Sequence, residues 1–331
     1  LAFGSTYSGA KTDADETTEY NVDTDTHGPA AQQVISESYQ FKGVTEPVSS
    51  GGTPADVFGG ISKVGNSTRE NTIDVASGSY NNAYGGHTTG TGTAKLGEYK
   101  DNSYKNKITI SGATVTGTVY GGYTTALTGT TTKNEVNVTG GSVTNVVGAQ
   151  SAGDATENTV TIGAAVTGDV KGGVSTAGAA SGNKVTLESG VTVGSVIGGD
   201  GLTETKDNEV TLKGNNTVNG LIRGGTVTGA TGNTLTVSGN NSAHNIEGFQ
   251  QLNFDAAANP MNPTNPMLNL TNGSTTTLDW DKIQLTSTRA GRIVLLQNTA
   301  GLSFNGTYTG LKTTNDADDK TEFNIDTDSP A

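Results

Sequence analysis

A short pattern that recurs seven times constrains the fold of this chain more than any other feature. Each copy opens with Asn and places aliphatic residues at the second and fourth positions after it. Successive copies start 24 to 35 residues apart, and the last three intervals are 25 residues each. A period of this length is typical of solenoids, in which each repeat forms one coil and stacks on the next. The copies begin at Asn71, Asn106, Asn134, Asn158, Asn183, Asn208 and Asn233.

Each copy also has the alternation of a β-strand. The aliphatic positions run from Ile73 and Val75 in the first copy to Leu235 and Val237 in the last, and the residues between them are polar. Such a period of two places one set of side chains in a core and the other in solvent. Because every copy repeats the pattern, we expect equivalent strands to stack in parallel and in register, about 4.8 Å apart.

A second strand in each repeat ends at a corner of small residues, usually Gly-Gly, about fifteen residues after the Asn. One column before this corner is aliphatic and is expected to face inward: Val57, Ala83, Val119, Val146, Val170, Val196 and Ile222. The next column accepts Lys and Arg and is therefore expected to face outward: Phe58, Tyr84, Tyr120, Val147, Lys171, Ile197 and Arg223.

These patterns predict an all-β fold, a right-handed parallel β-helix with strand-rich capping elements at its N- and C-terminal ends. Residues 1–48 are expected to form a hairpin-like cap with an acidic loop, and residues 49–248 a β-helix of about eight coils. Residues 249–301 would form irregular C-terminal coils, and residues 302–331 a terminal element that resembles residues 1–30. With 48 Gly and 31% hydrophobic residues, the 331-residue chain fits a thin, extended core better than a round one.

The recurrent Asn has a structural explanation. At a corner between stacked strands, an Asn side chain donates a hydrogen bond to one neighbouring coil and accepts one from the other. We therefore interpret the seven Asn residues as a structural ladder that satisfies buried polar groups, and not as a ligand site.

Charge and composition exclude several classes of partner. The formal net charge of −13 opposes binding to phosphate backbones and anionic lipid, so we expect no nucleic-acid partner. No apolar run approaches the 18 residues of a membrane-spanning helix, so we expect no membrane insertion of this segment. The chain contains no Cys, which excludes disulfides and thiolate metal sites.

The first 30 residues recur near the end of the chain. LAFGSTYSGAKT at residues 1–12 matches LSFNGTYTGLKT at residues 302–313, and NVDTD at residues 21–25 matches NIDTD at residues 324–328 after a two-residue insertion. The repeat distance is about 300 residues. We therefore expect the chain to be a unit of a longer tandem array whose units associate end to end.

The duplicated segments are acidic. Alternating carboxylates in a loop suit Ca²⁺, which takes six to eight oxygen ligands. Two interpretations stay open, a calcium site and a solvated acidic loop, and no other cofactor is expected. The residues concerned are Asp13, Asp15, Asp23, Asp25, Asp316, Asp318, Asp326 and Asp328.

No pattern of catalytic residues emerges from the repeats. Polysaccharide-cleaving enzymes need carboxylates clustered on one face, but acids such as Asp74, Glu135 and Asp169 occupy different positions of the repeat. The three His residues, His27, His87 and His244, are far apart in the sequence. We therefore expect no catalytic residues and no enzymatic activity.

Copies such as NKITISGATVTGTVYGG at residues 106–122, followed by NIEGFQQLNF at residues 245–254, resemble the passenger region of large bacterial autotransporter adhesins and haemagglutinin-like surface proteins. The resemblance covers roughly residues 50–300. It implies an extracellular location on the bacterial cell surface, and a role in adhesion, in proteolysis or simply in reach.

Two functional hypotheses follow. In the first, the segment acts in adhesion or recognition, and its outer aromatic residues bind a protein or glycan on a host or neighbouring cell. The ligand-binding candidates are Phe58, Tyr84, Tyr120 and Tyr123. In the second, the chain is a structural repeat unit of an extracellular fibre or surface layer that assembles end to end.

Overall fold

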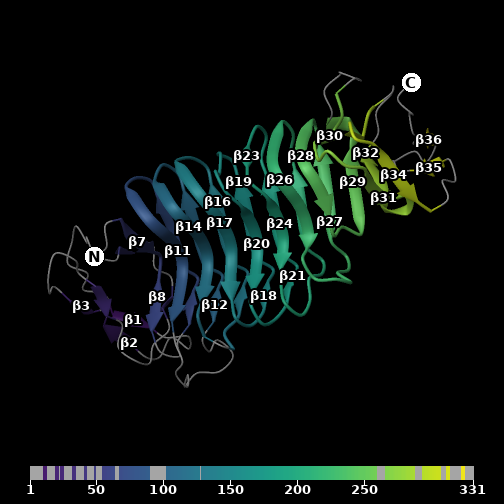
Figure 1. Ribbon diagram of the computed structural model, residues 1–331. Coiled ribbons are helices and arrows are strands. Elements are labelled where there is room, and N and C mark those ends of the chain that lie inside the picture. Colours follow the sequence, from purple (N-terminus) through teal and green to yellow (C-terminus); the bar gives the residue numbers. More distant parts are fainter. Residues whose placement is uncertain are drawn as a thin grey trace.

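The computed structural model describes residues 54–63, 67–89, 102–126, 128–258, 265–287 and 293–306, together with short strands nearer both termini. Successive coils stack along one axis from the N-terminal to the C-terminal end (Figure 1). The described residues form strands, turns and two single-turn 3-10 helices, η1 (Ala256–Ala258) and η2 (Trp280–Lys282). None of this described part contains a helix long and apolar enough to cross a membrane.

The Asn-led repeats form a parallel sheet of nine strands, one from each successive coil. Every pair is in register, so that Ile108 lies between Ile73 and Val136 on the neighbouring coils. This confirms the parallel stacking that the repeat predicts. In order, the strands are β10 (Thr72–Val75), β13 (Lys107–Ile110), β16 (Glu135–Val138), β19 (Thr159–Ile162), β22 (Lys184–Leu187), β25 (Glu209–Leu212), β27 (Thr234–Ser238), β29 (Gln251–Asp255) and β32 (Ile283–Ser287).

The strands that end at the Gly corners form a second sheet of thirteen strands. All its pairs are parallel except for β6, which runs antiparallel to β7 at the N-terminal edge. Its main path consists of β6 (Val48–Ser49), β7 (Ala55–Phe58), β11 (Ser79–Thr89), β14 (Thr114–Thr124), β17 (Ser142–Ser151), β20 (Val170–Ser175), β24 (Val196–Asp200), β26 (Asn216–Gly225), β28 (Asn241–Glu247), β30 (Leu268–Leu270) and β33 (Leu296–Asn298). Two short strands lie off this path, β8 (Ile61–Lys63) beside β11 and β23 (Thr192–Val193) beside β26.

A third sheet of six two-residue strands closes the coils on the remaining side. It consists of β5 (Phe41–Lys42), β9 (Thr68–Arg69), β12 (Ser103–Tyr104), β15 (Thr131–Thr132), β18 (Ala155–Thr156) and β21 (Ala180–Ser181). Three parallel sheets wound by one chain make the fold an all-β parallel β-solenoid, as the sequence predicts.

The core is a narrow column of aliphatic side chains between the sheets. Both aliphatic positions of all seven repeats are at most 2% exposed, and the column from Val57 to Ile222 is at most 1% exposed. The intervening positions, such as Thr186 and Glu209, are half-buried or exposed on the outer face. The stack also continues beyond residue 248, because β29 and β32 extend the first sheet while β30 and β33 extend the second.

Parallel stacking in register places equivalent outer residues directly above one another, so like charges would repel. Opposite charges meet at these positions instead. Lys107 lies opposite Glu135 at 2.7 Å, Lys184 opposite Glu209 at 3.1 Å, and Arg223 opposite Glu247 at 2.7 Å. Ion pairs on the outer face thus connect neighbouring coils and favour the observed register.

Both ends of the stack carry an antiparallel hairpin. At the N-terminal end, β1 (Ala10–Thr12) pairs with β2 (Glu19–Asn21), and β3 (Asp23–Asp25) pairs with β4 (Gln32–Val34). At the C-terminal end, β35 (Leu311–Thr313) pairs with β36 (Glu322–Asn324). The labels in Figure 1 show β1 and β2 at one end of the solenoid and β35 and β36 at the other.

Candidate functional site

The seven repeat Asn residues lie in one line inside the corner between the third and first sheets. Each is fully buried, with a relative exposure of 0%. The Asn134 backbone N–H and side-chain Nδ2 both donate to Oδ1 of Asn158, each at 3.0 Å. The Asn134 Nδ2 also donates to the Ser103 carbonyl oxygen at 2.9 Å. One side chain therefore uses its donor and acceptor groups to join neighbouring coils.

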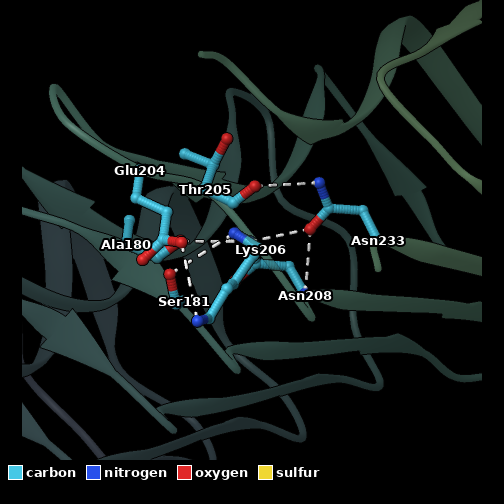
Figure 2. A network of polar contacts seen from close by, with 7 residues as sticks. All are labelled: Ala180, Ser181, Glu204, Thr205, Lys206, Asn208 and Asn233. Carbon is cyan, nitrogen blue, oxygen red and sulfur yellow. Dashed lines mark hydrogen bonds and ion pairs between the residues drawn. The ribbon is translucent and has the colours of Figure 1, made fainter. Parts of the chain in front are cut away.

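Figure 2 shows the same contacts near the C-terminal end of the ladder. The Asn208 N–H and Nδ2 donate to Oδ1 of Asn233 at 2.9 and 3.0 Å. The Asn208 Nδ2 also donates to the Ala180 carbonyl at 3.0 Å, and the Asn233 Nδ2 donates to that of Thr205 at 3.2 Å. These bonds occupy the amide groups of both side chains, which leaves them little capacity for a ligand.

The residue before each ladder Asn adopts the left-handed conformation, with φ between 50° and 68°. This single residue turns the chain from the third sheet into the first and directs the Asn side chain inward. The position holds Glu70, Lys105, Lys133, Glu157, Gly182, Asp207 and Gly232. Because its residue type varies so widely, the sequence alone does not reveal the conformation.

The ladder ends on a residue that the repeat pattern does not include. The backbone N–H of Asn233 donates to Oε1 of Gln250 at 3.0 Å. Gln250 thus supplies the acceptor that an Asn of the next coil would have provided. In the sequence, Gln250 directly precedes β29, which is the position that a ladder Asn occupies before the other strands of the first sheet. This position is the sequence signal for its role.

A second column of buried polar residues follows the Gly corners, and the sequence analysis did not predict it. Its hydroxyl side chains are at most 4% exposed: Thr88, Thr124, Ser151 and Ser175. Ser151 Oγ donates to the Asp154 carbonyl at 3.0 Å, and Ser175 Oγ accepts from the Gly178 N–H at 2.8 Å. These hydroxyls satisfy backbone groups of the following turn. Their signal is a Ser or Thr two residues after four successive corners, from Gly85-Gly86 to Gly172-Gly173.

The outer aromatic residues of the first coils form a compact stack. Phe58, Tyr84 and Tyr120 lie in register on β7, β11 and β14, with centroid separations of 5.0 and 5.1 Å and interplanar angles of 9°. Tyr123 packs edge-on against both Tyr84 and Tyr120. The structure therefore brings all four ligand-binding candidates together.

The outer column faces outward, as expected, but its first members are buried and not exposed to solvent. Phe58 is 5% exposed and Tyr84 is 7% exposed, although both lie on the outer side of the sheet. The reason is that each ring covers the face of the next, while His87 covers Phe58 and Tyr84. Only Tyr120 and Tyr123 remain half-buried.

Burial changes the acid–base properties of the aromatic stack. The pKa of His87 is lowered to about 4, mainly because burial penalises its charged form, and the nearby Asp56 opposes this shift. Burial also raises the pKa of the Tyr84 and Tyr120 hydroxyls. At neutral pH these rings are uncharged, so the stack offers apolar faces and hydroxyl groups.

The expected calcium ligands fall mainly outside the described residues, namely Asp13, Asp15, Asp316, Asp318, Asp326 and Asp328. Asp23 and Asp25 lie in β3, for which only the strand pairing is described. Within the described part of the chain, no group of three or more His, Cys, Asp or Glu residues is arranged to hold a metal ion. The calcium interpretation stays a prediction.

The start of the C-terminal duplicated segment is built into the solenoid. Strand β34 (Leu302–Asn305) pairs in parallel with β31 (Thr276–Asp279), and Phe304 lies opposite Leu278. The Phe304 ring stacks on that of Trp280, with centroids 4.1 Å apart, and both rings pack against the core. On the other face, Asn305 Nδ2 donates to Oδ1 of Asp279 at 3.0 Å.

The two duplicated hairpins have equivalent pairing. Lys11 lies opposite Tyr20 in the first copy, and Lys312 lies opposite Phe323 in the second. These pairs occupy matching positions of the sequence repeat. The two-residue insertion falls in the loop between the strands, where it leaves the pairing unchanged.

Comparisons with protein-family models, with curated proteins and with solved structures found no match to this chain. The architecture of the described residues is that of a parallel β-solenoid.

Proposed function

We propose that this chain is a structural unit that gives length and stiffness to an extracellular protein of the bacterial surface, in which solenoid units follow one another end to end. One observation carries the proposal. The same element, a strand sequence followed by a hairpin, occurs before and after the solenoid, and its second copy continues the stack through β34.

The contacts within the stack support a mechanical role. The inward columns fill the core, the Asn ladder satisfies buried polar groups, and outer charges pair with those of the next coil. Most of the distinctive side chains thus hold one coil to its neighbour. Since each coil depends on its neighbours for burial, the coils are expected to remain together as one continuous stack.

The extracellular bacterial location is inferred from the resemblance of the repeats to autotransporter passengers. A thin core rich in Thr, Asn and Gly, without Cys, suits a secreted solenoid that is stabilised by stacking and not by disulfides.

The test is to measure length in a chain that contains two units. A chain of residues 1–301 followed by residues 1–331 should form a rod. Its maximum dimension, measured by small-angle X-ray scattering, should exceed that of the single 331-residue chain by at least the length of one solenoid. The nine-stranded sheet alone spans about 40 Å at ~4.8 Å per strand. A two-unit chain that shows two flexibly linked bodies in electron micrographs would contradict the proposal.

A second candidate function is recognition by the aromatic stack. Its support is that Tyr120 and Tyr123 lie half-buried on the outer face, with their rings 4.9 Å apart. Adjacent rings of this kind suit sugars and protein surfaces. Replacing both by Ser should abolish binding to glycans or cells if they form the contact, while Tyr104→Ser on another strand serves as the control. Equal binding by both variants would exclude this surface.

A further inference from the structure

Strand β34 pairs with the edge of β31, and the sequence of β34 has a near-copy at residues 1–4 of the chain. Leu302–Asn305 reads LSFN and pairs with β31, whereas residues 1–4 read LAFG. The two segments share Leu and Phe at alternate positions, which lie on one face of a strand. In β34 this face carries Phe304, which packs against Trp280 and the core.

The residues that differ lie on the opposite face of the strand. Ser303 makes a hydroxyl–hydroxyl hydrogen bond with Thr277 at 2.7 Å, and Asn305 donates to Asp279 at 3.0 Å. The corresponding residues 2 and 4 are Ala and Gly, which make no side-chain hydrogen bonds. In the place of Leu302–Asn305, the sequence of residues 1–4 would supply the apolar side chains and the backbone pairing, but not the two polar side-chain contacts.

We propose that β31 and Trp280 form a docking site for the leading segment Leu1–Gly4 of a second copy of this chain, which adds as a parallel strand in place of Leu302–Asn305. The inference rests on the proposed function and specifies its junction. The sequence identifies residues 1–4 as the segment that would bind, because they repeat the apolar pattern of β34, the strand that pairs with β31. Strand addition of this kind supplies backbone hydrogen bonds for affinity and side-chain contacts for specificity.

The hairpins that follow the two segments fit the same junction. The C-terminal hairpin contacts the end of one stack through β35 and β32, and the N-terminal hairpin contacts the start of a stack through β1 and β5. Because the two hairpins have equivalent pairing, one hairpin placed between two copies would touch both. It would lie on β32 of the preceding copy and on β5 of its own.

Within a single chain, Leu302–Asn305 has the advantage. It is tethered close to β31, which gives it a high effective concentration, and it makes the two polar contacts that residues 1–4 lack. Exchange between copies is therefore expected when the internal strand is weakened, or when the two segments are made equal in sequence.

The test uses disulfide trapping in the full chain, which has no Cys of its own. Thr277 and Ser303 are register partners on neighbouring strands and their hydroxyls lie 2.7 Å apart, so Cys residues at these positions would face each other. Residue 2 is the counterpart of Ser303, so the trapping chain carries Ala2→Cys and Thr277→Cys together with Phe304→Ala. Mild oxidation should give a ladder of linked dimers and higher oligomers on non-reducing gels. Mixing isotopically labelled and unlabelled chains should show by mass spectrometry that the bond joins different copies.

Matched variants separate docking from random collision. Ala2→Cys with Thr161→Cys places the second thiol on the outer face of β19, in the middle of the stack, and should give at least tenfold less dimer. Adding Phe3→Ala to the trapping chain should reduce its yield by a similar factor. The pair Thr277→Cys and Ser303→Cys should form its disulfide within one chain and so verifies the geometry.

A second trapping chain avoids any loss of folding caused by Phe304→Ala. In it, Asn305→Gly weakens the internal segment while Phe304 remains, and Ala2→Cys and Thr277→Cys are kept. Cross-linking should rise with protein concentration. If both trapping chains give no more dimer than the Thr161→Cys control while the Ser303→Cys pair does form, the proposal is wrong. A two-unit chain that is still a continuous rod would then retain the proposed function with a different junction.

Discussion

Removing one rung of the Asn ladder tests whether the corner is held by side-chain amides. In the centre of the stack, Asn158 accepts from the N–H and the Nδ2 of Asn134, each at 3.0 Å. Its own Nδ2 donates to Oδ1 of Asn183 at 3.0 Å and to the Thr131 carbonyl at 3.2 Å. Asn158→Ala deletes these four hydrogen bonds in a region with no exposure to solvent.

The magnitude follows from these bonds. A typical hydrogen bond contributes about 1 kcal/mol net, and an orphaned buried group costs about 1–3 kcal/mol. Asn134 Nδ2 keeps its bond to Ser103, and Asn183 Oδ1 keeps the N–H of residue 158, so the Asn134 N–H is the main group left without its acceptor. We expect Asn158→Ala to lower the free energy of unfolding by about 4 kcal/mol.

The assay is urea unfolding followed by far-UV circular dichroism, with amide exchange of Asn134 as a local measurement. The control is Asn137→Ala on the outer face of β16, which should change the free energy of unfolding by about 0.5 kcal/mol or less. Asn158→Asp keeps the shape but places an acceptor against the Thr131 carbonyl, so it should destabilise at least as much as Ala. Equal midpoint shifts for Asn158→Ala and Asn137→Ala, with unchanged exchange at Asn134, would refute the reasoning.

Three further predictions concern the core, the corner and pH. Val185→Asp buries an unpaired charge and should cost several kcal/mol in thermal or urea unfolding, whereas Thr186→Asp on the outer face should cost about 0.5 kcal/mol or less. Asp207 has φ 54°, so Asp207→Gly should be neutral or stabilising by up to ~1 kcal/mol, and Asp207→Val should destabilise by at least that amount in the same assay. Because the pKa of His87 falls from 6.5 to about 4 on folding, only the unfolded state binds the proton between these values, and stability should decrease as the pH is lowered through this window. His87→Phe should flatten that part of the melting-temperature profile, and an unchanged slope would contradict the burial of the imidazole.

The aromatic stack shows where reasoning from sequence reached its limit. The Lys and Arg in the same column correctly indicate that it lies outside the solenoid, since a charged side chain does not fit the aliphatic core. They do not indicate exposure, because the rings of Phe58, Tyr84 and Tyr120 cover one another at the spacing of the strands. Exposure depends on neighbours from other coils, which become adjacent only when the chain has folded.

The sequence by itself determined the period, the inward columns and the parallel register. Each of these follows from local alternation repeated at a fixed interval, as the burial of Val185 and Val210 illustrates. The duplicated ends were visible in the same way, as matching text. Their equivalent hairpin pairing also depends on a loop that absorbs the two-residue insertion.

Only the tertiary structure decided the details of the corners and ends. The left-handed residue before each Asn is fixed by the closure of the coil, so Lys105 and Gly182 adopt the same conformation despite their different propensities. Gln250 ends the ladder because it reaches Asn233 from outside the repeat pattern. Likewise, Phe304 lies on Trp280 only because β34 adds to β31. The repeat pattern does not specify these features by residue type, because the left-handed position accepts Glu, Lys, Asp and Gly, and Gln250 and Phe304 lie outside the seven copies.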